Sequence, residues 1–333
     1  MEVVCVLKHD VLKILEEHKG EPVSGLEMGK RLDVSRSAVW KAVGQLKEDG
    51  YQIESIPNKG YCLSENNDII DPEKIASFLR TKYLGREFEL LEETDSTNSH
   101  LKRNADQLAG HNGYTVVALQ QTGGRGRMGR SFYSPAQQGV YMSFLLEPRF
   151  TFSDISLATV LAVVAVCRAI EEVAGFRPQV KWVNDVIYHG KKLVGILTEA
   201  SLETESGRIK YLIPGIGINI NRNENIPTEL RDIVGALNEF SEAPCDRNRL
   251  IASVLNHFEE IYETYLSGNR DAILDEYRGL LCVFGKEYNV ISPSGSYPAT
   301  PIDIDREARL IVKDRDGVIH TLNSGEISIR PQK

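Results

Sequence analysis

Long apolar stretches and paired cysteines are both missing from this sequence of 333 residues. No run of about 18 apolar residues occurs, so we expect no transmembrane helix and no membrane partner. The start of the chain lacks the basic-then-apolar layout of a secretory signal peptide. The five cysteines are scattered without a Cys-x-x-Cys pair, which argues against a zinc or dithiol site. We therefore expect a cytoplasmic protein whose thiols are reduced and mostly buried.

Internal repeats, low-complexity segments and a nucleotide-binding P-loop are absent as well. The segment Gly25–Arg31 contains glycines and a lysine, but it has one intervening residue too few and no Ser or Thr after the lysine. The net charge of −8 argues against indiscriminate binding of nucleic acid, although such a sum can hide a local basic face. The composition, 41% hydrophobic and 26% charged, is that of a globular protein, and the length predicts two or three domains.

The first 65 residues predict a winged helix-turn-helix. Apolar residues recur at helical spacing from 3 to 18, and a short helix over about 25–32 is followed by a turn. A third helix then places Val39, Val43 and Leu46 on its inner face. Two alternating segments, 51–56 and 60–63, flank a Pro-Asn-Lys-Gly turn and predict the two strands of a wing.

Positive charge is concentrated around the third helix. Between residues 29 and 47, five basic residues stand against the single Asp33, although residues 1–65 carry nine basic and eleven acidic residues. Groove-facing and wing-tip positions then predict these DNA contacts: Ser35, Arg36, Ser37, Lys41 and Lys59. We assign Trp40 to packing. A helix-turn-helix that binds a protein and never meets DNA is the alternative.

A polar linker over 64–68 separates this domain from a second one, which begins at the capped helix start Asp71-Pro72. Strand-like and helical segments mix up to about residue 282, which predicts a mixed α/β domain over 66–282. Helices are expected at 98–107 and 156–174, and a helical region at about 246–281. Residues 283–333 contain short strands that predict a small β-barrel.

Residues Gln120–Arg130 form a glycine-rich loop that contains three arginines. Glycines let backbone N–H groups approach a ligand, and arginines recognise carboxylate and phosphate, so this loop predicts an anion site. The alternative is a flexible, solvated linker. We favour the functional interpretation because strands bracket this short loop, and loops on a rigid scaffold usually carry the chemistry.

Three further segments each admit two interpretations. Asn184-Asp185, in the segment Lys181–Val186, can position Mg²⁺ beside a phosphate or can form an Asx turn. Residues Thr94–Asn98 can cap a helix or bind a polar ligand head. Pro214–Ile220 can be a buried, glycine-kinked strand, or a strand whose bare backbone lets a nucleotide approach while Asn219 contacts it.

In this order, these segments resemble the biotin-protein ligases, specifically the bifunctional kind that also represses transcription. The marks of the resemblance are Asp95–Asn98, Gly124–Arg130, Lys181–Asp185, Lys192–Leu197, Gly215–Asn219 and Gly325–Arg330. The resemblance implies an α+β chain: a winged helix-turn-helix, a mixed α/β ligase domain of the class II aminoacyl-tRNA synthetase type, and a C-terminal SH3-like β-barrel.

The implied activity is that of a biotin-[acetyl-CoA-carboxylase] ligase. Such an enzyme activates biotin with ATP and Mg²⁺ to biotinyl-5'-AMP and transfers biotin to a lysine of a biotin carboxyl carrier protein. The resemblance also implies a homodimer that binds operator DNA in response to biotinyl-AMP.

Position by position, the resemblance implies biotin contacts from Ser96, Thr97, Asn98, Gln121, Arg125, Gly126, Arg127 and Lys192. It implies ATP contacts from Gly124, Arg130, Lys181, Asn184 and Asn219. Asp185 would hold Mg²⁺, and Arg127, Lys181 and Asp185 would be catalytic. We expect Arg127 to retain the adenylate and Lys192 to hold the biotin carboxylate.

Three positions depart from the family pattern: Gly123 replaces an alanine, Phe132 a tryptophan and Val183 a proline. Phe132 keeps an apolar wall but lacks an indole N–H. Two other functions stay open from the residues alone. One is a lipoate-type acyl ligase, which the arginine loop disfavours, and the other is a transcription regulator that senses a small molecule without ligase activity.

Overall fold

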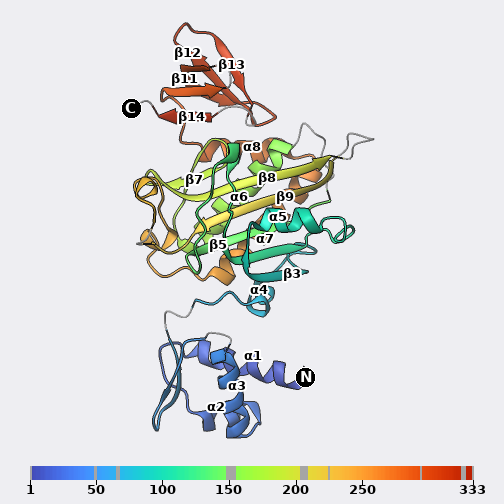
Figure 1. Ribbon diagram of the computed structural model, residues 1–333, viewed down its shortest axis with the longest axis vertical. Helices are drawn as coiled ribbons and strands as arrows, with labels where there is room; N and C mark the ends of the chain where they lie inside the picture. The colour runs from blue at the N-terminus through green and yellow to red at the C-terminus, as the bar shows by residue number, and fades with distance from the viewer. Residues whose placement is uncertain are drawn as a thin grey trace. The chain divides into compact units, whose positions relative to one another are not determined.

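A computed structural model of the protein describes residues 2–48, 51–64, 68–147, 155–202, 209–223, 226–292, 295–323 and 328–331 (Figure 1). The chain divides into two compact units, Met1–Ile69 and Ile70–Lys333. Each unit has its own hydrophobic core. No described helix is long and apolar enough to cross a membrane.

The first unit contains the expected three helices and two antiparallel strands: α1 (Glu2–Glu17), α2 (Gly25–Leu32), α3 (Arg36–Glu48), β1 (Ile53–Ile56) and β2 (Gly60–Leu63). Val39, Val43 and Leu46 of α3 are buried, as their spacing predicts. At the wing, Gly60 has a φ of +118°, and a Cβ there would lie 2.1 Å from the Val23 carbonyl oxygen. This turn therefore requires glycine.

The second unit begins with α4 (Pro72–Phe78), which Asp71 caps by accepting bonds from two backbone N–H groups. A seven-stranded sheet follows, with the strand order β3-β4-β5-β9-β8-β7-β6. Its strands are β3 (Phe88–Thr94), β4 (Thr115–Gln121), β5 (Gly139–Phe144), β6 (Gln179–Lys181), β7 (Asp185–Tyr188), β8 (Lys191–Leu202) and β9 (Ile209–Asn219). Only the β3–β4 pair is parallel.

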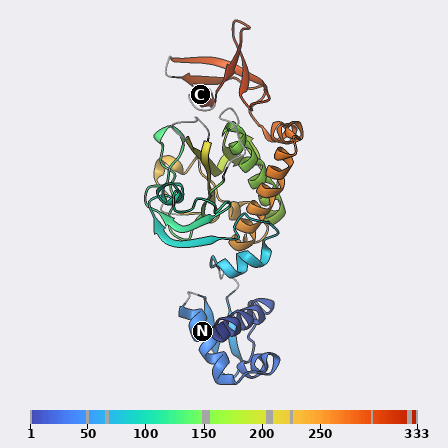
Figure 2. The ribbon, with the colours of Figure 1, turned by 90° about the vertical axis from the view of Figure 1, so that its right-hand side faces the viewer.

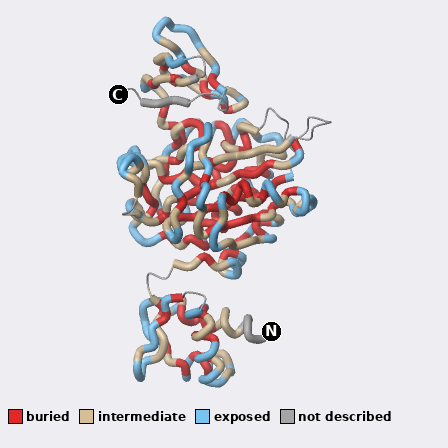
Figure 3. The backbone as a smooth tube through the Cα atoms, viewed as in Figure 1, coloured by how far each residue is buried: buried red, intermediate tan, exposed pale blue. Residues whose placement is uncertain are grey.

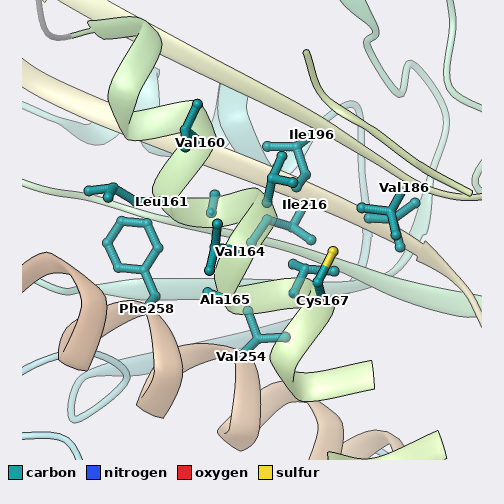
Figure 4. Packing of buried hydrophobic residues seen from close by; sticks show 14 of the residues in the cluster. Val160, Leu161, Val164, Ala165, Cys167, Val186, Ile196, Ile216, Val254 and Phe258 are labelled. Carbon is teal, nitrogen blue, oxygen red and sulfur yellow. The ribbon is translucent and has the colours of Figure 1, made fainter. Parts of the chain in front are cut away.

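Helices cover both faces of this sheet. α6 (Ile155–Ala174) lies on one face with α7 (Arg247–Leu266) and α8 (Arg270–Leu280) behind it (Figure 2). Val160, Val164 and Cys167 of α6 pack near Ile196 and Ile216 of the sheet (Figure 4). The short helix α5 (Thr97–Asn104) packs on β4, β5 and β9.

The apolar sequence of α6 fits its position between layers. Most of its residues are buried, and Figure 3 shows the buried segments concentrated in the centre of this unit. A helix that is apolar on nearly all sides belongs inside a protein. Four cysteines in the described part of the chain are free; Cys167 and Cys245 are buried, whereas Cys62 and Cys282 are half-buried. The Cys5 side chain lies outside the described residues.

The C-terminal strands form an open antiparallel sheet with the order β13-β12-β11-β10-β14. They are β10 (Tyr288–Ser292), β11 (Gly295–Ile304), β12 (Leu310–Asp314), β13 (Ile319–Leu322) and β14 (Ser328–Pro331). Within the described residues the edge strands β13 and β14 do not pair with each other, so the sheet does not close. The predicted SH3-like β-barrel is therefore not confirmed.

This C-terminal sheet packs onto the ligase-like part of the second unit. Val290, Leu310 and Val312 belong to the same buried cluster as α6 and the seven-stranded sheet. The Trp182 indole N–H also donates to the Ala308 carbonyl oxygen at 3.1 Å. The boundary predicted at residue 283 remains a prediction, as does the predicted linker, of which residues 65–67 lie outside the described chain.

Candidate functional site

One transverse row of the seven-stranded sheet contains much of the candidate site. Five residues on neighbouring strands pair in this row: Lys181, Asp185, Gly195, Gly217 and Tyr141. Residues directly opposite one another in a sheet point to the same face. Ile196 and Ile216, next to the two glycines, belong to the core with α6. The row therefore faces away from α6, on the side that carries α5.

Glycines on β8 and β9 leave this face of the sheet bare. A Cβ on residue 215 would lie 2.0 Å from Asn98 Oδ1, and one on residue 217 would lie 2.4 Å from the Phe132 ring. Gly195 also lies beneath the Phe132 ring, since a Cβ on residue 195 would be 3.0 Å from an atom of that ring. The glycines of residues 214–220 thus make room for Asn98 and Phe132, and the predicted approach of a nucleotide to this strand stays a prediction.

A small polar pocket opens above this glycine floor. Its lining comes from α5, β4, the arginine loop and the floor: Ser96, Thr97, Asn98, Gln121, Arg125, Phe132, Gly195, Leu197, Gly215, Ile216 and Gly217. The free space is about 30 Å³, which is roughly the share of one water molecule in the liquid. A ring-shaped ligand therefore requires Phe132 or the arginine loop to shift outward.

Hydrogen bonds fix the polar side chains around this pocket. The Thr97 backbone N–H donates to Gln121 Oε1 at 2.9 Å, and Gln121 Nε2 donates to Ser134 Oγ at 2.9 Å. Ser143 Oγ lies 2.6 Å from Thr97 Oγ1 and 2.6 Å from Asn98 Oδ1. The Thr94–Asn98 segment leads into α5, but Ser96 makes no side-chain cap there. The side chains of Ser96, Thr97 and Asn98 line the pocket.

The arginine loop is connected to the sheet through Asn184. Arg127 Nη1 donates to Asn184 Oδ1 at 3.1 Å, and Asn184 Nδ2 donates to the Ile196 carbonyl oxygen at 2.7 Å. Burial lowers the pKa of the Arg127 guanidinium, and the nearby Asp185 carboxylate opposes this shift. Arg125 and Arg130 are exposed. Asn184 thus links the loop to β8.

Lys192 and Asp185 form the closest ion pair of the site, with 2.6 Å between Lys192 Nζ and Asp185 Oδ1. Lys192 Nζ also lies 6.0 Å from the centre of the Phe132 ring, within the range of a cation–π contact. Burial lowers the pKa of the Lys181 amine, and the charges of Lys192 and Arg130 add to this effect while Asp185 opposes it. Two amines, Lys181 from the row and Lys192 from β8, therefore lie near one carboxylate, Asp185.

A larger cavity, of about 1280 Å³, lies on the other side of Phe132. Arg130, Lys181, Asp185, Lys192 and Asn219 line it, and Phe132 lines both this cavity and the polar pocket. Small-molecule sites typically enclose about 300–1000 Å³, so a nucleotide fits in this space. Arg130, Lys181 and Lys192 in its lining carry positive charge and can bind phosphate.

The predicted site residues fall into three groups. Those in the polar pocket are Ser96, Thr97, Asn98, Gln121 and Arg125. Those in the larger cavity are Arg130, Lys181, Asp185, Lys192 and Asn219; of these, Lys192 was predicted on the biotin side. Gly124, Gly126, Arg127 and Asn184 line neither space. Gly124 lies below the loop, where a Cβ would be 2.3 Å from the Phe132 carbonyl oxygen.

Sequence reasoning missed several residues that shape the site. Ser143 and Glu199 bond to Asn98 from β5 and β8, and Ser134 bonds to Gln121. Single polar residues within strands give no periodic signal, so nothing in the sequence separates them from ordinary strand positions. Phe132 is visible in the sequence only as a departure from the family pattern, and its place between the two spaces comes from the fold.

The predicted DNA-binding residues are all exposed on α3 and the wing: Ser35, Arg36, Ser37, Lys41 and Lys59. Ser35 Oγ also accepts the Ala38 backbone N–H at 3.2 Å, so this hydroxyl caps α3. Our assignment of Trp40 to packing is wrong, because the residue is 63% exposed. It lies between Arg36 and Ser37 around the helix, away from the face that carries Val39 and Val43.

Each of the two units matches the profile of a known protein family. The profile of the Biotin/lipoate A/B protein ligase family matches residues 90–219, and that of an HTH domain matches residues 8–62. The bifunctional ligase/repressor BirA of Bacillus subtilis is 33% identical over 316 residues, which make up 94% of this chain and 95% of that protein. The protein of the same name from Escherichia coli is 27% identical over 312 residues, 93% of this chain and 94% of that protein.

A solved structure of similar fold is the biotin protein ligase from Aquifex aeolicus in complex with biotin and ATP. It is 29% identical, with a TM-score of 0.64, and the match covers 74% of this chain and 100% of that chain. The sequence match to the Bacillus subtilis protein extends through the helix-turn-helix as well as the ligase region. This chain therefore belongs to the family of bifunctional ligase/repressor proteins, the biotin-protein ligases that carry a helix-turn-helix.

Proposed function

We propose that the polar pocket binds the ring system of biotin, that the larger cavity binds ATP, and that the two ligands meet at Phe132 and Lys192. In this proposal the chain converts biotin and ATP to biotinyl-5'-AMP and transfers biotin to a lysine of a biotin carboxyl carrier protein. The observation that carries the proposal is the shared wall: Phe132 borders both spaces, and the Lys192–Asp185 pair lies beside it.

The polarity of the small pocket supports biotin over lipoate as the acid. Biotin carries a cyclic urea with two N–H donors and one carbonyl acceptor, whereas the dithiolane ring of lipoate has neither. The hydroxyls of Ser96 and Thr97 and the Gln121 amide lie in the lining, together with Arg125. Each buried polar group that a ligand leaves unpaired costs about 1–3 kcal/mol. A lipoate ring would make no hydrogen bond to these groups and would cut them off from water.

The first proposed step brings two anions together. The biotin carboxylate attacks the α-phosphorus of ATP, the bond to the bridging oxygen of the β-phosphate breaks, and pyrophosphate leaves. Lys181, Lys192 and the half-buried Arg127 offset the repulsion between carboxylate and phosphate. Each charge-assisted hydrogen bond contributes about 1.5–3 kcal/mol, so loss of one cation should slow the step severely without abolishing it.

The residues present fit Mg²⁺ only when it is accompanied by phosphate. No group of three or more His, Cys, Asp or Glu side chains in the described chain is arranged to hold a metal ion. Mg²⁺ characteristically uses one or two carboxylates together with substrate phosphates and water. Asp185 lines the larger cavity and would be the carboxylate that holds the ion. Bound there, Mg²⁺ would neutralise phosphate charge.

In the second proposed step the acceptor lysine attacks the carbonyl carbon of biotinyl-AMP, and AMP leaves. An unperturbed lysine has a pKa of about 10.4, so its amine must lose a proton before the attack. Asp185 lines the larger cavity and pairs with Lys192, and we assign it the role of receiving that proton. Arg127, linked to the sheet through Asn184, would retain the adenylate until the acceptor arrives.

An ATP–pyrophosphate exchange assay in the presence of biotin tests the activation step. We expect exchange that depends on biotin and does not occur with lipoate. Lys192→Ala should weaken biotin binding and reduce exchange by about tenfold or more. Lys210→Ala, which removes a surface lysine paired with Asp106, serves as the matched control. Exchange with lipoate but not with biotin would establish the acyl ligase alternative, and no exchange at all would establish a ligand-sensing regulator.

Two further measurements address the later steps. Labelled biotin should appear on a biotin carboxyl carrier domain only when ATP is present. Arg127→Gly should release biotinyl-AMP into solution, and unchanged retention would rule out the role given to Arg127.

We also propose that the helix-turn-helix makes the chain a biotin-responsive repressor that binds a palindromic operator as a homodimer. A single recognition helix reads only one half-site, so a two-fold operator requires two copies. A footprint on the operator should strengthen when biotin and ATP are added. Protection of the operator that does not change when biotin and ATP are added would contradict the coupling between the ligase site and DNA binding.

A further inference from the structure

A chain of buried hydrogen bonds runs from Glu199, through Asn98 and Ser143, to the Thr97 hydroxyl in the polar pocket. Thr97, Asn98 and Ser143 are each less than 5% exposed. Their bonds use the protein's own groups on both sides, so the direction of each proton can be deduced from the inventory of donors and acceptors. The starting point is the amide of Asn98.

The orientation of Asn98 is fixed by two acceptors that have no proton to give. Asn98 Nδ2 lies 3.1 Å from the Leu197 carbonyl oxygen and 3.0 Å from Glu199 Oε2. Only the NH₂ end of the amide can donate to a carbonyl and a carboxylate, so Oδ1 must point the other way. The missing side chain of Gly215 provides the space, since a Cβ there would lie 2.0 Å from Oδ1.

This orientation determines the two hydroxyls that follow. Asn98 Oδ1 can only accept, so Ser143 Oγ, at 2.6 Å, donates its single proton to it. Ser143 then has no proton left for Thr97 Oγ1, which also lies at 2.6 Å. Two oxygens 2.6 Å apart need a proton between them, so Thr97 donates to Ser143, and its lone pairs are the hydrogen-bonding capacity it offers to a ligand.

The amide oxygen of Gln121, Oε1, lies on the same side of the pocket as the Thr97 hydroxyl. Its Nε2 donates to Ser134 Oγ at 2.9 Å, and Ser134 in turn donates to the Phe132 carbonyl oxygen at 3.1 Å. Its Oε1 accepts the Thr97 backbone N–H at 2.9 Å. Thr97 Oγ1 is also within hydrogen-bond distance of Gln121 Oε1, at 3.3 Å, but its 2.6 Å contact with Ser143 is much shorter. With the Thr97 proton on Ser143, two acceptors stand together at this side of the pocket.

We propose that Ser143 is a positioning residue that makes Thr97 an obligate hydrogen-bond acceptor, so that the pocket selects a ring N–H donor on the bound acid. This inference rests on the proposed function, because it takes the cyclic urea of biotin as the ligand. Ser143 does not line the pocket. It acts through Thr97, and Glu199 and Leu197 act through Asn98.

A double-mutant cycle tests the proposal on the full-length protein. Ser143→Ala removes the acceptor of the Thr97 proton and frees Thr97 to point that proton elsewhere, and Thr97→Val removes the hydroxyl itself. We expect each single variant to raise the Kd for biotin about tenfold, which corresponds to the loss of one hydrogen bond. The double variant should also be weakened only about tenfold, because without the Thr97 hydroxyl Ser143 has nothing to position.

The kinetic readout separates positioning from general damage. Ser143→Ala should raise the KM for biotin and leave the KM for ATP within about twofold, since the larger cavity does not contain this network. Ser143→Cys, which keeps a weak donor and a similar shape, should recover part of the biotin affinity. If Ser143→Ala does not fold, Ser143→Cys carries the cycle with Thr97→Val in its place.

The outcomes separate this inference from the proposed function. If the wild-type chain binds biotin and supports exchange, but Ser143→Ala binds biotin equally well, the positioning role is overturned and the ligase function stands. A roughly hundredfold loss in the double variant would mean that the two residues act independently, which also overturns it. If the wild-type chain fails to bind biotin, the proposed function and this inference both fail.

Discussion

Phe132 is the residue that most directly connects the two halves of the candidate site. Its ring fills the space above Gly195 and Gly217, approaches Tyr141 edge-on at 6.5 Å between ring centres, and lies under the Lys192 amine. An aromatic wall in this position can contact both ligands. It can also hold Lys192 near the point where the carboxylate of biotin and the α-phosphate of ATP must meet.

We expect Phe132→Ala to raise the KM for both biotin and ATP. Full burial of a phenylalanine side chain is worth about 1.5–3 kcal/mol, so removal of a shared wall should weaken each ligand by about tenfold or more. Initial rates of exchange with either substrate varied would measure this. Phe78→Ala, at a partly exposed position on α4, is the control. An increase in only one of the two KM values would mean that Phe132 serves a single pocket.

Lys181 combines a useful charge with an unfavourable environment. Burial lowers the pKa of its amine below that of an exposed lysine. The unfolded chain therefore binds more protons than the folded chain in the pH range between the two pKa values. Stability of the wild type consequently rises with pH through that range, since the cost of holding the buried charge disappears as the folded-state amine deprotonates.

Lys181→Met should therefore separate stability from activity. We expect the ligand-free variant to be at least as stable as the wild type at pH 7, and its advantage to shrink as the pH is raised from about 7 to 10. Its exchange activity should fall by roughly 100-fold or more, as is typical when a cation that stabilises developing charge is removed. Thermal unfolding across pH, with exchange at pH 7, measures both. An advantage that grew with pH would contradict the assigned direction of the pKa shift.

At single residues, sequence patterns predict the charged groups of the site better than its supports. Lys181, Asp185 and Lys192 are conspicuous because they stand in short motifs, and the sheet register brings them together as expected. Ser143 and Glu199 give no comparable signal, because their role depends on which strands are neighbours. Trp40 misled the prediction because an aromatic residue on a short helix is more often buried than exposed.

At the scale of elements, long uniform segments were predicted closely. The helix expected at 156–174 is α6, Ile155–Ala174, because an apolar run without glycine or proline has few alternatives. The helical region expected at about 246–281 is two helices, α7 and α8, separated at Gly268, whose φ is +90°. β11 gives only a weak strand signal in the sequence, because Pro298 and Pro301 interrupt it; the structure has a bulge beside Pro301.

One connection between elements depends on a single buried carboxylate. Glu259 of α7 is 6% exposed and accepts the backbone N–H groups of Lys82, Tyr83 and Leu84, at 2.5, 3.2 and 3.1 Å. These residues form the loop that leads into β3. The carboxylate therefore holds α7 to the edge of the seven-stranded sheet, although the two bonded segments are 175 to 177 residues apart in the sequence.

We expect Glu259→Ala to destabilise the second unit by about 3–5 kcal/mol, because three N–H donors, of which that of Leu84 is buried, would lose a charged acceptor. Glu260→Ala is the matched control: the neighbouring side chain is 66% exposed, and its surface pairs with Arg168 and His257 should each be worth about 0–1 kcal/mol. Urea unfolding followed by circular dichroism would compare the two. Equal midpoints for both variants would show that the loop does not depend on Glu259.

At the scale of the whole molecule, two independent cores imply two separable functions. The first unit has a core of its own around Val39, Val43 and Leu46, and the second has the core around α6. The Aquifex aeolicus ligase, whose full length matches 74% of this chain, illustrates that a biotin protein ligase of this fold is smaller than this chain. Ligase chemistry should therefore need only the second unit.

A chain that begins at Ile70 should keep ATP–pyrophosphate exchange within about twofold of the full-length protein and lose DNA binding. In the full-length chain, Arg36→Ala should leave exchange unchanged and weaken DNA binding, and it should reduce the salt dependence of that binding by about one phosphate contact. Arg36 is suited to this test because it is exposed at the start of α3 and lies outside the ligase site. Fluorescence anisotropy with operator DNA over a salt series would measure both effects. If the shortened chain folds but loses exchange, the first 69 residues contribute to the ligase site, and the two functions are not separable.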